Sequence, residues 1–199
     1  MLVLHCKRLT ETAASRKELR AAQSAAAWAL LHEIATEYGL SDAVFAKTTW
    51  GRPYCKNTPT VDFSLSHTST LAACAFWQKN TGIAPRIGID AEKRSTHSKD
   101  KIFRLALRFF GAHEYRYVRN AKDPQAAFTR VFVRKEAYAK YCGNGLGNHL
   151  SASDTLAPDF KAQNGVRFLT LREGEHYICI CLPLDCTEPL QRFRAKKQD

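Results

Sequence analysis

An alanine-rich run from Thr12 to Tyr38 constrains the fold of this chain more than any other sequence feature. Alanine is the strongest helix former, and Gly39, directly after the run, is the residue type that most often follows the end of a helix. Residues 1–6, 44–49 and 61–66 are short and apolar, as strands are. The first part of the chain therefore predicts one long helix set among short strands.

The rest of the chain continues this mixed pattern. Residues 71–77 and 86–92 favour two more strands, and residues 101–143 favour two or three helices with an interruption near 120–124. Residues 165–182 are typical of a β-hairpin that turns at Glu173-Gly174. This order of elements predicts an α+β fold of two similar halves, residues 1–95 and 96–199, within one continuous unit.

Composition and charge narrow the function classes. The 199 residues are 45% hydrophobic and carry a formal net charge of +11, so the partners are expected to be anionic: nucleic acid, phosphorylated small molecules, an acidic protein or a membrane surface. The apolar start of the chain, residues 1–4, is too short for a signal peptide, and no stretch approaches the roughly 20 apolar residues that span a bilayer. Seven cysteines without a C-x-x-C pair fit small core residues better than a disulfide framework. We therefore expect a cytoplasmic protein that does not enter the membrane.

Two short acidic motifs carry the most chemical information. In residues 86–92, strand alternation places Asp90 and Glu92 on one face, opposite the apolar side chains between them. Glu136 and Lys140 are four residues apart, which puts them on the same face of the predicted helix. Three carboxylates and a lysine are suited to hold a hard divalent ion and the phosphates that it neutralises.

Each motif also has an ordinary structural explanation. Asp90 and Glu92 also fit the solvent-exposed face of an edge strand, and Glu136 and Lys140 fit a surface ion pair of a helix. His67, after the predicted strand 61–66, fits a hydrogen-bonded loop or core histidine. Taken singly, none of these residues decides between the two explanations.

Five stretches in order resemble the 4'-phosphopantetheinyl transferases of the larger, Sfp-like type, and they favour the functional explanation. Each stretch is weak alone, but the ordered set, over about residues 51 to 147, is specific. The stretches are Gly51-Arg52-Pro53, Phe63-Ser64-Leu65-Ser66-His67-Thr68, Ile87-Gly88-Ile89-Asp90-Ala91-Glu92, Phe109-Phe110-Gly111-Ala112-His113-Glu114, and residues 132–140 followed by Gly143-Asn144-Gly145.

The resemblance implies a fold and a reaction. Such enzymes move the phosphopantetheine arm of coenzyme A onto a serine of an apo acyl or peptidyl carrier protein, and they release 3',5'-ADP. The implied fold is a pseudo-dimer of two α+β halves with the active site in the cleft between them. The acceptors belong to fatty acid, polyketide or nonribosomal peptide biosynthesis. An acidic carrier protein would also account for the net charge of +11, since a basic surface steers an acidic partner.

The resemblance also implies roles for single residues. Asp90, Glu92 and Glu136 match the Mg²⁺ ligands, Glu136 matches the residue that takes the serine proton, and Lys140 matches the lysine that contacts the phosphates. Glu114 matches an acidic residue with a supporting role near the cleft. The coenzyme A contacts implied in the same way are Arg52, Pro53, Ser66, His67 and Lys140, together with the basic residues Arg16, Lys17 and Arg20 of the first helix.

Two departures from the family pattern concern packing. Phe132 stands where the family has tryptophan, which keeps the aromatic bulk, and Ala91 is smaller than the usual branched residue. Neither change removes a metal ligand. We expect a monomer, because an internally duplicated fold supplies its own cleft.

Two other hypotheses remain open from the sequence. A basic nucleic-acid-binding module would explain the charge, although the basic residues are dispersed and no RNA- or DNA-binding motif is evident. A different Mg²⁺-dependent phosphoryl-transfer enzyme, such as a nuclease, would use the same three carboxylates. As a partner of this chain, nucleic acid is less favoured than coenzyme A.

Overall fold

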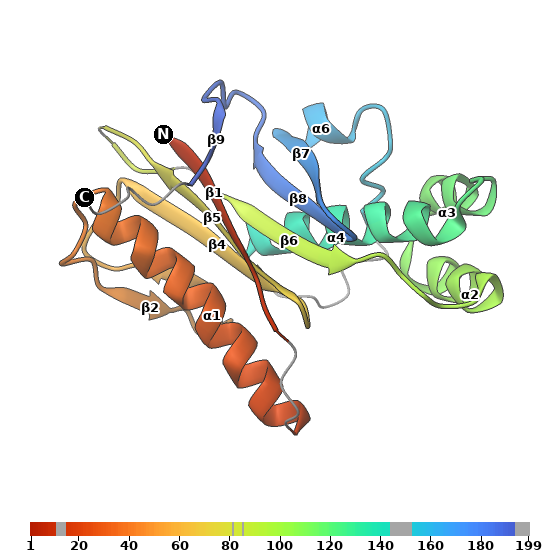
Figure 1. The fold of residues 1–199 in the computed structure, drawn as a ribbon. Helices are drawn as coiled ribbons and strands as arrows, with labels where there is room; N and C mark the ends of the chain where they lie inside the picture. Colours follow the sequence, from red (N-terminus) through yellow and green to blue (C-terminus); the bar gives the residue numbers. More distant parts are fainter. Residues whose placement is uncertain (11–14, 81, 85, 144–152, 194–199) are drawn as a thin grey trace.

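The computed structural model describes residues 1–10, 15–80, 82–84, 86–143 and 153–193, and the fold is mixed α and β (Figure 1). The first part of the chain contains β1 (Leu2–Arg8), α1 (Arg16–Glu37), β2 (Phe45–Lys47), β3 (Pro53–Cys55), β4 (Val61–His67), β5 (Leu71–Gln78) and β6 (Gly88–Lys93). The second part contains α2 (Lys99–Phe109), α3 (Ala112–Arg119), α4 (Pro124–Cys142), α6 (Phe160–Gln163), β7 (Val166–Glu173), β8 (His176–Pro183) and β9 (Leu190–Arg192).

Helix α1 begins and ends where its flanking residues satisfy the free backbone groups. Ser15 is the N-cap, and its hydroxyl accepts from the Glu18 backbone N–H while the Glu18 carboxylate accepts from the Ser15 backbone N–H. Gly39 follows the helix at a φ of 72°, which confirms the predicted glycine stop. The helix predicted over residues 12–38 thus starts at Arg16, and residues 12–14 lie outside the described residues.

The first sheet has the strand order β4-β5-β1-β9, and α1 covers one of its faces (Figure 1). Strand alternation explains the contact, because every second side chain of the sheet, such as Val3, Phe63 and Phe76, packs against Leu30 and Ile34 of α1. This burial removes large apolar side chains from water, which is the main stabilisation of such a layer. Strands β2 and β3 form a separate two-stranded sheet. Strand β2 lies within the predicted strand 44–49, whereas β3 was not predicted.

The second sheet has the order β6-β8-β7 and packs against α4. Its Tyr177, Cys179 and Cys181 face Val133 and Ala137 of that helix, which are fully or almost fully buried. The opposite face carries Ile89 and Ile180 and shares one apolar core with the first sheet. Helices α2 and α3 pack on the first half of α4 around Ile102, Val118 and Val131.

The structure confirms the predicted α+β class, whereas the equivalence of two halves and the division at residue 95 stay predictions. Strand β6 precedes residue 95 and pairs with β8, and β9 returns to pair with β1. Both sheets therefore draw strands from both sides of that division. None of the helices in the described part of the chain has the length and apolar character that a membrane crossing requires.

Candidate active site

The two sheets are joined by side chains of β4 that bind the free backbone edge of β6. The backbone N–H groups of Ile89 and Ala91 donate to the hydroxyls of Ser64 and Ser66, each at 3.1 Å. The N–H of Ile87 donates in the same way to the Asp62 carboxylate at 2.8 Å. Residues two apart in each strand point the same way, so alternate positions of β4 meet alternate N–H groups of β6. This side-chain ladder fixes where β6 presents its acidic residues.

Asp90 lies at the centre of the site. Its Oδ1 accepts from the Lys140 ammonium at 2.8 Å and from the Ser66 hydroxyl at 2.9 Å. Its Oδ2 is buried and has no hydrogen-bond partner among the described residues. A buried carboxylate oxygen without a donor is costly, so the site has capacity for one further positive group. Since Asp90 is only 5% exposed, the hypothesis of a solvated strand face is wrong for it.

Glu92 and Glu136 lie close enough to Asp90 for its negative charge to shift their pKa values. Burial and, to a smaller extent, the negative charge of Asp90 together raise the pKa of each to about 7, against the opposing effect of the Lys140 ammonium. The structure therefore brings the three predicted carboxylates into one electrostatic neighbourhood with Lys140. The described residues contain no group of three His, Cys, Asp or Glu side chains arranged to hold an ion together, so the metal site stays a prediction. The unsatisfied Asp90 oxygen and the repelling carboxylates fit a hard divalent cation.

A hollow of about 280 Å³ opens beside these residues. Among the predicted coenzyme A contacts it is lined by Arg52, Pro53, His67 and Lys140. It is also lined by Trp28, Lys47 and Trp50, which the sequence analysis did not single out. Trp50 is 77% exposed, and its position directly before the Gly51-Arg52-Pro53 stretch was the available signal.

His67 lies between cations. Burial lowers its pKa, the Lys140 ammonium lowers it further, and Arg20 acts in the same direction, while Asp90 opposes them. Arg20 of α1 therefore lies close enough to act on the same region, and like Arg16 and Lys17 on the first turn of the helix it is exposed. A neutral histidine among positive groups favours an anionic ligand.

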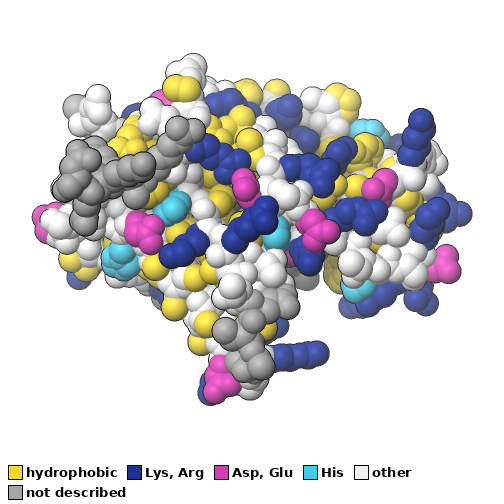
Figure 2. All heavy atoms as spheres, in the orientation of Figure 1, with side chains coloured by type: hydrophobic (Ala, Val, Ile, Leu, Met, Phe, Trp, Pro, Cys, Tyr) yellow, Lys and Arg dark blue, Asp and Glu magenta, His cyan; other side chains and the backbone are white. Residues whose placement is uncertain are grey.

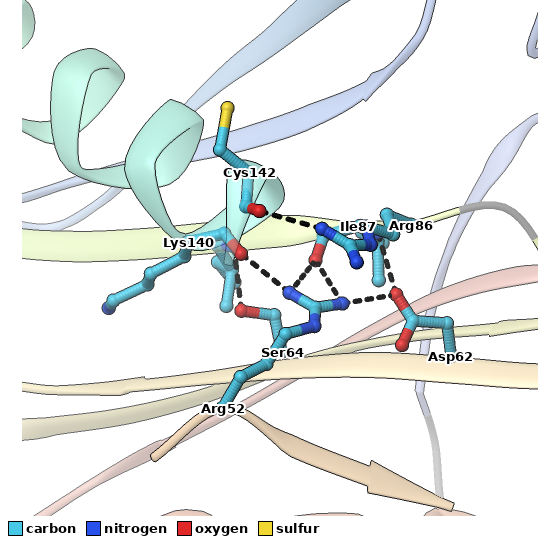
Figure 3. Close-up of polar contacts among 8 residues, drawn as sticks. Arg52, Asp62, Ser64, Arg86, Ile87, Lys140 and Cys142 are labelled. Atoms are coloured by element: carbon cyan, nitrogen blue, oxygen red, sulfur yellow. Dashed lines mark hydrogen bonds and ion pairs between the residues drawn. The ribbon is translucent and has the colours of Figure 1, made fainter. Parts of the chain in front are cut away.

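Arg52, for which the resemblance implies a coenzyme A contact, forms hydrogen bonds within the protein (Figure 3). Its guanidinium donates to the Asp62 carboxylate at 2.6 Å and to the backbone carbonyl of Lys140 at 2.5 Å, with longer contacts of 3.4 Å to the carbonyl of Ile87. In the close-up the Lys140 side chain points away from this guanidinium. Arg52 thus connects β4, the start of β6 and the end of α4.

We predict that Arg52→Gln lowers the free energy of unfolding by about 2 kcal/mol, because it leaves the nearly buried Asp62 carboxylate without its counter-charge. Urea unfolding measures the effect. Asp62→Asn and the double variant complete a mutant cycle, in which the double variant should lose less than the sum of the single losses. Additive losses would contradict the assigned ion pair.

Glu114 is buried and bonded to neighbouring protein groups. It is fully buried, its Oε2 accepts from Lys135 at 2.6 Å, and its Oε1 accepts from the backbone N–H and hydroxyl of Thr155 at 2.8 and 2.7 Å. Lys135 also donates to the backbone carbonyl of Ser153. This ion pair ties α3 and α4 to the segment that begins at residue 153. Asn144 and Gly145, which belong to the last matching stretch, lie outside the described residues.

The raised carboxyl pKa values predict an unusual pH dependence. The folded protein holds protons on Glu92 and Glu136 up to about pH 7, whereas in the unfolded chain these groups lose them near pH 4.5. The metal-free protein should therefore lose stability as pH rises from about 4.5 to 7. Urea unfolding in EDTA over this range measures the slope. Glu136→Gln, which cannot titrate, should reduce it, and an unchanged slope would refute the assignment.

The fold and this site together define an α+β protein with a hollow lined by basic residues next to a cluster of carboxylates. Residues 86–183 match the family model of the 4'-phosphopantetheinyl transferase superfamily. The chain belongs to this superfamily.

Curated relatives agree with this assignment. The chain is 33% identical over 159 residues to a 4'-phosphopantetheinyl transferase of Bacillus subtilis, an alignment that covers 77% of this chain and 64% of the relative. It is 26% identical over 176 residues to the L-aminoadipate-semialdehyde dehydrogenase-phosphopantetheinyl transferase of Saccharomyces cerevisiae, with 82% and 64% covered. The 4'-phosphopantetheinyl transferase HetI of Nostoc is 36% identical over 99 residues, with 48% and 38% covered. The aligned region thus spans less than two thirds of these relatives, and the first two are consistent with the Sfp-like type.

Proposed function

We propose that this protein transfers the 4'-phosphopantetheine arm of coenzyme A to a serine of an apo acyl or peptidyl carrier protein and releases 3',5'-ADP. The observation that carries the proposal is Lys140, whose ammonium binds Asp90 and which lines the hollow. The Lys140 ammonium lies between the carboxylates and the hollow, where its positive charge would stabilise the negative charge of a bound diphosphate.

Coenzyme A is assigned to the hollow. His67 and Lys140 would face its phosphates, while the exposed ring of Trp50 offers a flat surface for the adenine. Ser66 is hydrogen-bonded to Asp90 and to β6, so we assign it to holding the site rather than to contacting the ligand. Arg16 and Arg20 are proposed to meet the 3'-phosphate from α1.

Asp90, Glu92 and Glu136 would hold Mg²⁺, which when bound supplies positive charge to the diphosphate oxygens. The chain itself supplies the proton acceptor. With a pKa raised to about 7, Glu136 can accept the proton of the serine hydroxyl near neutral pH. The serine oxygen bonds to the β-phosphorus while the bond from this phosphorus to the bridging oxygen breaks. The electron pair leaves with 3',5'-ADP, whose negative charge Lys140 stabilises.

The proposed partner is an acidic carrier protein. The net charge is +11, and Figure 2 shows Lys and Arg side chains gathered over α2 and α3 at one end of the molecule with few Asp or Glu among them. Complementary charge raises the rate of encounter. We further propose a cytoplasmic monomer in which the two α+β halves form a pseudo-dimer around the hollow.

The test is the intact mass of an apo carrier protein after incubation with this protein, coenzyme A and Mg²⁺. We expect a mass gain of one phosphopantetheine that EDTA abolishes. If several acyl and peptidyl carrier proteins all keep their apo mass, the proposed transfer is wrong. Nucleic acid would then be the next substrate to try, according to the hypotheses drawn from the sequence.

A further inference from the structure

A second hollow, of about 370 Å³, is lined by residues of α3, α4 and the β7–β8 hairpin, and Figure 1 shows the hairpin lying along α4. We call it the arginine hollow, because three arginines line it: Arg130 and Arg134 of α4 and Arg172 of β7. The polar or aromatic residues Tyr117, Thr170 and Tyr177 line it as well. No Asp or Glu is among its described lining residues.

The three guanidinium groups are held by aromatic rings. Those of Arg130 and Arg172 lie over the same ring, that of Tyr177, at 5.8 and 4.8 Å from its centroid. Arg172 and Tyr177 are directly paired across the two strands, which explains the second contact. The guanidinium of Arg134 lies 4.2 Å from the ring centroid of Phe168. The ring contacts hold the groups in place without neutralising them.

No described carboxylate forms an ion pair with these arginines, although Glu114 and Asp154 act on Arg134, and Asp123 on Arg130, from a greater distance. Among the described ion pairs, Arg52, Arg94 and Arg192 each have an acidic partner, whereas none includes an arginine of the hollow. The Nε of Arg134 is buried and lacks any hydrogen-bond partner among the described residues. A buried donor without an acceptor is destabilising, and a bound oxyanion would supply the missing acceptor.

This hollow is distinct from the candidate active site. Arg134 and Glu136 are two residues apart on α4, which places them about 200° apart around the helix axis. The two hollows have no lining residue in common. An inference about the arginine hollow therefore does not depend on the proposed transfer reaction.

We propose that the arginine hollow binds a phosphate-bearing small molecule. Arginine presents paired N–H donors that match the oxygens of a phosphate, and charge-assisted bonds of this kind are stronger than neutral ones. The hydroxyl of Tyr117, which also lines the hollow, adds a donor. The volume lies in the range of about 300–1,000 Å³ that small-molecule sites occupy, so a diphosphate or a phosphorylated metabolite fits better than a lone inorganic phosphate.

The test follows the arginine side chains by NMR while inorganic pyrophosphate is added to the full chain. The Nε–Hε resonance of Arg134, assigned with Arg134→Lys, reports on this hollow alone, even if pyrophosphate also enters the active site. We expect this resonance to shift and saturate below about 10 mM pyrophosphate, whereas sodium chloride at equal ionic strength leaves it in place.

Variants then test the site itself. Arg130→Gln and Arg172→Gln each replace an exposed arginine and should weaken pyrophosphate binding about tenfold or more. Arg104→Gln, an exposed arginine of α2 outside the hollow, is the matched control and should change nothing. A resonance that does not saturate, or that saturates equally in all variants, would overturn the proposal. So would saturation by a glutamate-rich peptide without any response to pyrophosphate, which would assign the hollow to a protein contact.

Discussion

Gly88→Ala is expected to lower the free energy of unfolding by about 4 kcal/mol and to move α4 away from β6. A Cβ atom at position 88 would lie 2.1 Å from the backbone oxygen of Ala137 and 2.5 Å from the backbone nitrogen of Tyr141. Both clashing atoms belong to the backbone of α4, so no side-chain rotation relieves them. The glycine is therefore required for the close approach of strand and helix.

The same contact has a functional consequence. Asp90 and Glu92 lie on β6 and Glu136 and Lys140 lie on α4, so the distance between the two elements sets the distance between the acidic groups and the lysine. A displacement of about 1 Å, as the clash requires, is enough to impair catalysis by positioned groups. Gly88→Ala should thus reduce both stability and any transfer activity.

Urea unfolding measures the stability of the Gly88 variant. Gly111→Ala is the matched control, because the nearest atoms that a Cβ there would meet belong to the Asp154 side chain, at 3.3 Å and beyond, and the residue has an ordinary φ of −67°. We expect the control to lose less than about 1 kcal/mol. Equal losses in the two variants would show that the β6–α4 contact is not the reason for the effect.

The fold class was predictable because most elements have local signals. The alanine-rich run with Gly39 after it, and the alternation of apolar and acidic residues in 86–92, each depend on neighbouring residues alone. Strands β3 and β9 were not predicted, since each is three residues long and is defined by a partner strand. The ladder from Ser64 and Ser66 to β6 joins separate sheets, and no local pattern specifies such a contact.

The candidate site was likewise predictable in part. Asp90, Glu92, Glu136 and Lys140 were singled out by spacing and resemblance, and the structure brings them together. The simpler hypothesis of a surface pair within one helix missed that Lys140 pairs with Asp90, which lies on another element. The structural contacts of Arg52 could not be foreseen either. They depend on Asp62 and on backbone carbonyls that come close only in the folded chain.

Glu136→Gln is expected to reduce the proposed transfer by about 10²–10⁴-fold while the protein stays folded. The amide keeps the size of the side chain but cannot accept the serine proton. It also removes a negative charge that burial and Asp90 already disfavour, so stability at pH 7.5 should be unchanged or higher. The rate of mass gain of an apo carrier protein, with coenzyme A and Mg²⁺ at saturation, is the measurement.

Glu175→Gln is the matched control for this prediction. Its side chain is 74% exposed in a surface ion pair with Lys93, so the same chemical change there should leave the transfer rate within about twofold. If Glu136→Gln transfers at nearly the rate of the wild type, Glu136 is not the proton acceptor. If the variant loses transfer together with its fold, the carboxylate is structural. Because the raised pKa predicts a variant at least as stable as the wild type, urea unfolding separates a lost proton acceptor from a lost fold.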